Sequence, residues 1–389
     1  MRSKKILVCF FIIILTVFYI SNYSTIYTID DLAYVIGIGF DTADNNGIIK
    51  LSLQVAIPNS QGDNSGGGSS SQSESSIVKT VECNTISDGI NLINSYIGKK
   101  LSLSYCKVIV FSKDIPSKKI INYTATLLND VEVRPYCSVL LSKCEASYFL
   151  ENSEPLLEKL SSKYYNSNPS PEQTTGLTEH INLVDFYNDY YDTFGDPCAV
   201  LGDITSEESE KSHIENFGIA SFHNGMLTGE LTGDETIYHL IITNKLQNTV
   251  LSIPNPFNDS EYIGLSIDSA HTKSNAKIVN GFPYITCDIK FNTRILSSSI
   301  NSDYLDENNL EKIEDYANSF FKVNIENYLY KTSLVLKSDI AKFGKYGVRN
   351  FLTWDKWKEY DWLNKYTNST FKVNVDTHLK SSYLVVGIN

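Results

Sequence analysis

The six histidines are the first candidates for metal or acid–base chemistry, because imidazole is the commonest metal ligand and titrates near neutral pH. A metalloprotease pattern needs two histidines one helical turn apart with a glutamate beside them, and no histidine here has such a partner. His378 falls in an alternating strand pattern and is expected to be an ordinary surface or half-buried residue. The six are His180, His213, His223, His239, His271 and His378. We therefore name no metal-ligating residue.

Short motifs for cofactor, hydrolase and calcium chemistry are incomplete. Gly37 and Gly39 lack the third glycine and the following helix of a dinucleotide-binding fingerprint, and no Gly-x-Ser-x-Gly elbow occurs. The polar residues from Asp41 to Asn46 do not keep the alternate spacing of an EF-hand loop, and a solvated hairpin turn explains them more simply. The sequence thus predicts no cofactor and no catalytic residue.

Two pairs of carboxylates would share a helix face, which raises the question of a glycosidase. Asp185 and Asp189 lie four residues apart, as do Glu311 and Asp315. A glycosidase holds two carboxyls in a cleft, one with a raised pKa, and this spacing does not establish such a cleft. We expect solvated acidic faces instead.

The tryptophans and cysteines are expected to be structural. Trp354, Trp357 and Trp362 would form one helical stripe, which favours core packing over an interface anchor. No CxxC occurs, and six cysteines lie outside the apolar segment that contains Cys9. Their wide, irregular spacing is not that of a disulfide scaffold, so we expect most of them to be buried thiols.

The chain has 389 residues, and its composition is that of a folded protein. Its 33 Lys+Arg and 45 Asp+Glu give a formal net charge of -12. Such an acidic chain lacks the basic stripe that nucleic-acid binding requires, so no nucleic-acid partner is expected.

An apolar run occupies residues 6–20 (ILVCFFIIILTVFYI), preceded by Arg2, Lys4 and Lys5. Continued to residue 27 as a helix of 22 residues, it is long enough for the roughly 30 Å hydrocarbon core. A cleaved secretory signal is the alternative, but residues 21–25 offer no good cleavage site. We expect residues 1–27 to be a single-pass anchor in the lipid bilayer with the rest exported. The exported part carries a net charge of -15, so we expect it to touch the membrane mainly through its anchor.

The exported part is expected to be α+β, a multi-domain mixed α/β ectodomain with mainly antiparallel sheets. We divide it into an N-terminal region, 28–205, of one or two subdomains, a linker at 206–216 and a C-terminal α/β domain at 217–389. Residues 59–76 (NSQGDNSGGGSSSQSESS) predict a flexible loop. The main predicted strands are 32–41, 48–57, 106–111, 136–141, 217–222, several between 250 and 296, 371–378 and 382–388; the main helices begin near 85, 120, 178, 233, 310 and 354.

Nine segments are informative together, although each is weakly specific alone. They are 32–41 (LAYVIGIGFD), 51–58 (LSLQVAIP), 98–110 (GKKLSLSYCKVIV), 129–134 (NDVEVR), 155–160 (PLLEKL), 218–222 (GIASF), 227–236 (LTGELTGDET), 339–344 (DIAKFG) and 354–357 (WDKW). In their order and spacing, which extend over most of the chain after residue 30, they resemble the Ger(x)C family, the C subunits of spore germinant receptors.

The resemblance implies a non-catalytic component of a nutrient germinant receptor complex in the spore inner membrane, needed for germination. Its implied partners are the receptor's A and B membrane subunits, and a nutrient germinant is a possible ligand. Family members are usually lipoproteins, whereas residues 21–25 contain no cysteine and Cys9 lies too early, so a helix is expected to replace the lipid. The alternative is a stand-alone, membrane-anchored extracytoplasmic protein that binds or hydrolyses cell-wall sugars or nutrients.

Overall fold

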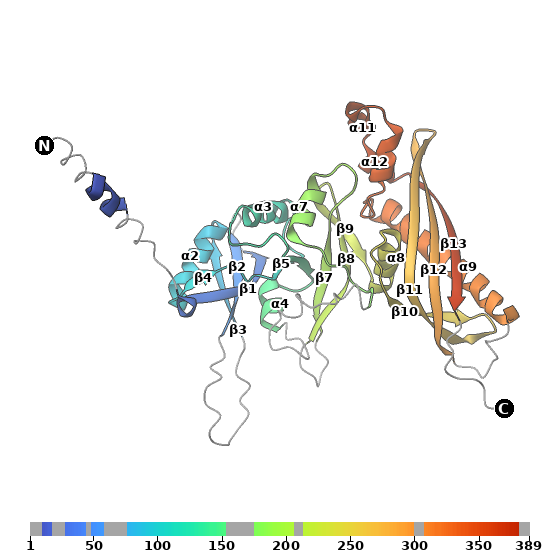
Figure 1. Ribbon diagram of the computed structural model, residues 1–389, viewed down its shortest axis with the longest axis horizontal. Helices are drawn as coiled ribbons and strands as arrows, with labels where there is room; N and C mark the ends of the chain where they lie inside the picture. Colours follow the sequence, from blue (N-terminus) through green and yellow to red (C-terminus); the bar gives the residue numbers. More distant parts are fainter. Residues whose placement is uncertain are drawn as a thin grey trace, which may run out of the picture.

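The computed structural model of the chain describes residues 10–17, 28–43, 48–57, 76–152, 175–205, 213–298 and 307–380. They form two β-sheets side by side along the longest axis of the molecule, with helices on both (Figure 1). This confirms the predicted mixed α/β architecture.

The first sheet has nine strands in the order β3-β2-β1-β5-β6-β7-β8-β9, with β4 paired to β1. Its central pairs β1–β5, β5–β6 and β6–β7 are parallel, while both flanks are antiparallel hairpins. The strands are β1 (Leu32–Thr42), β2 (Ile49–Ala56), β3 (Ser76–Cys83), β4 (Lys100–Ser102), β5 (Val108–Ser112), β6 (Ser138–Ser142), β7 (Cys198–Thr205), β8 (His213–His223) and β9 (Met226–Leu231).

The sheets are mainly antiparallel, as expected, but the centre of the first sheet is parallel. Between β5 and β6 the chain forms α3 (Ser117–Leu128), and between β6 and β7 it forms α4 (Ala146–Asn152) and α7 (Leu183–Tyr191). A helical crossover returns the chain to the same end of the sheet, so the next strand runs parallel. This half also contains α2 (Ile86–Ile97), which the Thr85 side chain caps by accepting the Asp88 N–H.

The second sheet has the order β10-β11-β12-β13, built from β10 (Thr249–Asn255), β11 (Asn258–Val279), β12 (Phe282–Ser298) and β13 (Thr370–Lys380). The first three are antiparallel neighbours, and β13 runs parallel to β12. The long helical crossover before β13 explains that parallel pair. It contains α9 (Glu307–Tyr330), the π-helix η2 (Lys331–Val335), α10 (Gly344–Gly347), α11 (Trp354–Tyr360) and α12 (Trp362–Tyr366).

Helix α8 (Gly233–Ile242) lies between the two sheets (Figure 1). Thr232 and Glu235 form a capping box at its start, which satisfies free backbone N–H groups. All of its residues from Thr236 to Ile242 are buried, and the helix packs against β8 of the first sheet and β11 of the second. The buried apolar residues of the two halves form one contiguous cluster around it.

Several predicted boundaries shift for local reasons. The helix expected from residue 178 begins at Leu183, because Asn182 caps it and Ile181 accepts a hydrogen bond from the Val139 N–H in the sheet. β8 begins at His213, within the segment expected to be a linker, and pairs with β7. Residues 59–75 and the strand predicted at 382–388 lie outside the described residues.

The predicted anchor also lies mostly outside them. Residues 10–17 are helical and apolar, and their neighbours on both sides are not described. Among the helices that the structure does describe, none is both long and apolar enough to cross a membrane.

Candidate functional site

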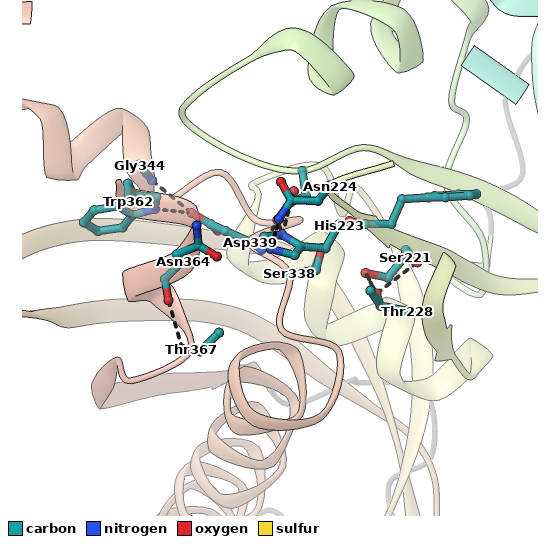
Figure 2. A network of polar contacts seen from close by, with 12 residues as sticks. Ser221, His223, Asn224, Thr228, Ser338, Asp339, Gly344, Trp362, Asn364 and Thr367 are labelled. Atoms are coloured by element: carbon teal, nitrogen blue, oxygen red, sulfur yellow. Dashed lines mark hydrogen bonds and ion pairs between the residues drawn. The ribbon is translucent and has the colours of Figure 1, made fainter. Parts of the chain in front are cut away.

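A buried network of polar side chains joins the first sheet to the helices before β13 (Figure 2). Its centre is Asp339, which has no exposed surface and follows the π-helix η2. One carboxylate oxygen, Oδ1, accepts the backbone N–H of Phe343 at 3.0 Å. The other, Oδ2, accepts the N–H of Gly344 at 3.0 Å and the indole Nε1–H of Trp362 at 2.8 Å. A single carboxylate therefore holds α10 and α12 together.

Burial raises the pKa of Asp339 to about 7, and the neighbouring Asp196 carboxylate adds to the rise. The three donors around Asp339 oppose this shift because they favour the charged form. The resulting pKa means that this group changes charge close to neutral pH, inside the folded protein.

Asp196 extends the network into the first sheet. It lies just before β7, and its Oδ2 accepts the backbone N–H of Asp339 at 2.9 Å. The Asp196 N–H in turn donates to the Asp339 carbonyl at 3.1 Å. Segments more than 140 residues apart are thus joined by one backbone–side-chain and one backbone–backbone hydrogen bond, and Asp196 is only 2% exposed.

His223, at the end of β8, completes the network. Its Nδ1 lies 3.1 Å from both carboxylate oxygens of Asp196, and its Nε2 lies 2.9 Å from the Asn224 side-chain nitrogen. The hydrogen bond with Asp196 raises the pKa of His223, and burial opposes that rise only in part. Because Asn224 adopts a left-handed conformation (φ 49°), the turn after β8 directs its side chain back to this histidine.

Backbone packing around the network is too tight for larger residues. The Ser338 hydroxyl donates to the Phe222 carbonyl of β8 at 2.8 Å. A Cβ at Gly344 would lie 2.5 Å from the Phe194 carbonyl oxygen. Only glycine permits this close approach between position 344 and the backbone of the loop that precedes β7.

A second buried cluster lies beside α8. The Glu179 carboxylate, 2% exposed, contacts His239 Nε2 at 2.9 Å and also the Lys245 ammonium. His239 Nδ1 lies 2.7 Å from the Tyr328 hydroxyl of α9. Burial alone would raise the pKa of Glu179, but His239 and Lys245 outweigh it and hold the pKa at about 2. This cluster links the segment before α7 to α8 and α9.

A third contact corrects the prediction for the carboxylate pairs. Asp189 of α7 is largely buried and forms an ion pair of 2.6 Å with Lys342. Burial raises the pKa of Asp189, and Lys342 opposes the rise. Its helical neighbour Asp185 is exposed, as are Glu311 and Asp315, so the predicted solvated face holds for those three residues only.

Asp41 was also predicted wrongly as part of a solvated turn. It is 4% exposed, and its two oxygens accept the N–H groups of Ala146 and Ser147 at 2.6 and 3.0 Å. The carboxylate of β1 therefore caps the start of α4 from a distant part of the chain. Residues 44–47 of that turn lie outside the described residues.

The structural roles predicted for tryptophan and cysteine are mostly confirmed. Trp357 and Trp362 are buried and stack with ring centroids 5.6 Å apart, while Trp354 is 48% exposed. Asp361, in a left-handed conformation, breaks the single helix that the sequence predicted into α11 and α12. The six cysteines outside the apolar segment are free thiols, and all but Cys144 are buried.

These buried networks are arranged to hold parts of the chain together. In the part of the chain that the structure describes, no group of three or more metal-binding side chains is placed to hold an ion. His378 is exposed, as expected. The contacts of His223 with Asp196 and of His239 with Glu179 and Tyr328 join residues distant in sequence, and no local pattern marks either histidine. Any displacement of the 338–366 segment from β7 and β8 would break hydrogen bonds to buried charged groups, which are costly to leave unpaired.

The fold agrees with a known structure. It matches a chain described as "Crystal Structure of the GerBC protein" with a TM-score of 0.54 and 16% sequence identity, covering 88% of this chain and 96% of that one. None of the curated proteins compared with the chain matches it.

Two family models match the sequence itself. Residues 27–205 match the spore germination protein N-terminal domain, and residues 217–383 match the Spore germination B3/GerAC-like C-terminal domain. Together these ranges cover most of the chain. The chain therefore belongs to the Ger(x)C family of spore germination proteins.

Proposed function

We propose that this chain is the non-catalytic C subunit of a nutrient germinant receptor and is needed for spores to respond to at least one nutrient. The observation that carries the proposal is the match of both family models, the N-terminal one over residues 27–205 and the C-terminal one over residues 217–383. The fold likeness to the GerBC protein supports it. In this role the chain assembles with the receptor's A and B membrane subunits.

The proposed location is the spore inner membrane, with residues 28–389 on the extracytoplasmic side. The apolar run at 6–20 behind Arg2, Lys4 and Lys5 supports a retained single-pass anchor at 1–27. Two units, 28–205 and 217–389, would follow it, with their strands β7 and β8 paired in one sheet.

The two buried polar clusters, one around Asp339, Asp196 and His223 and the other around Glu179 and His239, are together called the buried junction and suggest how such a subunit works. Three buried carboxylates, those of Asp196, Asp339 and Glu179, form hydrogen bonds or ion pairs between segments that are distant in sequence. These contacts favour a rigid body in which a displacement of one half moves the other half as well. We propose that the chain acts by assembling with the other receptor subunits and by transmitting a displacement between its two halves.

Deletion of the gene in the native host tests the proposal. Spores should form in normal number and lose the response to one nutrient, and a copy of the gene at another locus should restore it. A second copy lacking residues 1–27 should fail to restore it if the anchor is required. Deletion spores that respond to every nutrient like the parent strain would overturn the proposed role.

A further inference from the structure

One end of the first sheet exposes aromatic and aliphatic side chains to solvent. Tyr105, in the loop after β4, is 51% exposed, and Tyr136, in the loop before β6, is 74% exposed. Val131, in the same loop as Tyr136, is fully exposed, and Tyr96 in the last turn of α2 is 65% exposed. We refer to Tyr96, Tyr105, Val131 and Tyr136 as the aromatic end.

Specific contacts hold these loops in place. The Tyr105 ring packs edge to face on Tyr34 of β1, with centroids 4.8 Å apart, and the Arg134 guanidinium lies 5.8 Å from the Tyr105 ring. The Glu132 side chain accepts the Leu103 N–H at 3.0 Å, which ties the two loops to each other. The exposed rings are therefore presented by an ordered surface.

The elements α2 and β4 lie where the chain enters the fold at β1 (Figure 1). β1 begins at Leu32 and pairs with β4 from Lys100, and Asn94 of α2 accepts the Leu101 N–H at 2.8 Å. α2 and β4 consequently flank the first residues of β1. From Thr28 to Tyr34 the backbone spans at most about 20 Å, at roughly 3.3 Å per residue.

Basic side chains lie beside the aromatic rings, near the exposed Asp30 and Asp31 that precede β1. Lys99 and Lys100 are exposed between α2 and β4, and Arg134 lies over Tyr105. The Lys79 ammonium lies 4.8 Å from the Tyr96 ring. Tyrosine with flanking lysine and arginine is the composition enriched at membrane–water interfaces, where the ring sits at headgroup depth and the cation reaches the phosphate.

We propose that the aromatic end inserts into the headgroup layer of the bilayer and forms a second membrane contact beside the anchor. The inference rests on the proposed anchor, since Thr28 directly follows residues 1–27. It revises the expectation that the acidic ectodomain touches the membrane mainly through its anchor. The contact fixes the tilt of the first sheet relative to the membrane.

Quenching by brominated lipids tests this contact with the full-length chain. Val131→Trp and Tyr136→Trp place an indole at the aromatic end, and Tyr262→Trp, at a residue 60% exposed on β11, is the matched control. Each variant is reconstituted into phosphatidylethanolamine–phosphatidylglycerol vesicles with or without brominated acyl chains. Emission from the native tryptophans, measured on the unsubstituted chain, is subtracted.

We expect brominated lipid to remove a large part of the added emission of Val131→Trp and Tyr136→Trp and to leave that of Tyr262→Trp unchanged. Flotation of the same vesicles after alkaline extraction reports the anchor separately. Variants that float but show no more quenching than Tyr262→Trp overturn the membrane contact and leave the proposed function intact; a protein subunit as the true occupant would give this result. A chain that does not float contradicts the anchor itself.

Discussion

Replacing Asp339 with asparagine separates the charge of this carboxyl group from its shape. Asparagine keeps one acceptor oxygen for the donors from Phe343, Gly344 and Trp362, but its amide cannot titrate. The unfolding free energies of the wild type and of Asp339→Asn should therefore depend differently on pH, and the difference reports the pKa of Asp339 in the folded state.

The size of this difference follows from linkage. The folded-state pKa is about 7, against a value of 3.8 for an unperturbed aspartate, so between these values the folded protein binds the proton more strongly than the unfolded chain. The contribution of Asp339 to stability is thus greatest at low pH and falls as pH rises toward 7, by about 1.4 kcal/mol per pH unit. Between pH 5 and pH 8 the wild type should lose about 2.5 kcal/mol that Asp339→Asn does not lose.

Urea unfolding of the full-length chain in detergent micelles at pH 5 and pH 8 measures this loss. Tryptophan fluorescence is a direct reporter, because Trp362 donates to Asp339. Asp355→Asn, at an exposed residue in the first turn of α11, is the matched control and should follow the wild type at both pH values. The reasoning is refuted if the difference between wild type and Asp339→Asn is the same at pH 5 and pH 8.

Three further substitutions test the junction and its supports. Glu179→Gln should destabilise the fold by about 3 kcal/mol at pH 7, because it leaves His239 beside an uncharged partner. The cost of this substitution should be smaller in acid, because the lowered pKa of Glu179 contributes stability that is present above pH 4.5 and is lost as the pH falls toward 2. Urea titrations that give an equal cost at pH 3 and pH 7 would contradict the pairing. Asp41→Ala should cost about 1.5 kcal/mol through the lost cap of α4, and hydrogen exchange should rise first in that helix rather than uniformly. Gly344→Ala should cost about 2 kcal/mol or more because its Cβ meets the Phe194 carbonyl, and a midpoint equal to the wild type's would show that the backbone can move apart there.

The elements of the fold could be predicted where the signal is local. The Thr85 side chain starts α2, and the capping residues Thr232 and Glu235 start α8, because a cap and the apolar spacing behind it lie within one short window. The hairpin of β1 and β2 and the long α9 followed from the same kind of evidence. The parallel centre of the first sheet was not predicted, although strands and helices alternate there; the expectation of mainly antiparallel pairing holds for the flanks of that sheet and for β10 to β12.

The buried junction could not be predicted, because its members depend on partners far along the chain. Asp196 meets Asp339 across 143 positions, and Asp41 meets Ala146 across 105. An aspartate in a polar segment has the same local pattern whether it is solvated or buried. The family resemblance, carried by order and spacing over the chain, was therefore more informative about function than any single candidate residue.

Recovery of the tagged full-length chain from detergent-solubilised spore membranes of the native host, read by mass spectrometry, tests the proposed role most directly. We predict that two integral membrane proteins, the A and B subunits of one receptor, are recovered with it in constant proportion, and that a copy lacking residues 1–27 recovers neither from the membrane fraction. Recovery of the chain alone, or its presence in vegetative cells and absence from spores, would contradict the assignment to a germinant receptor.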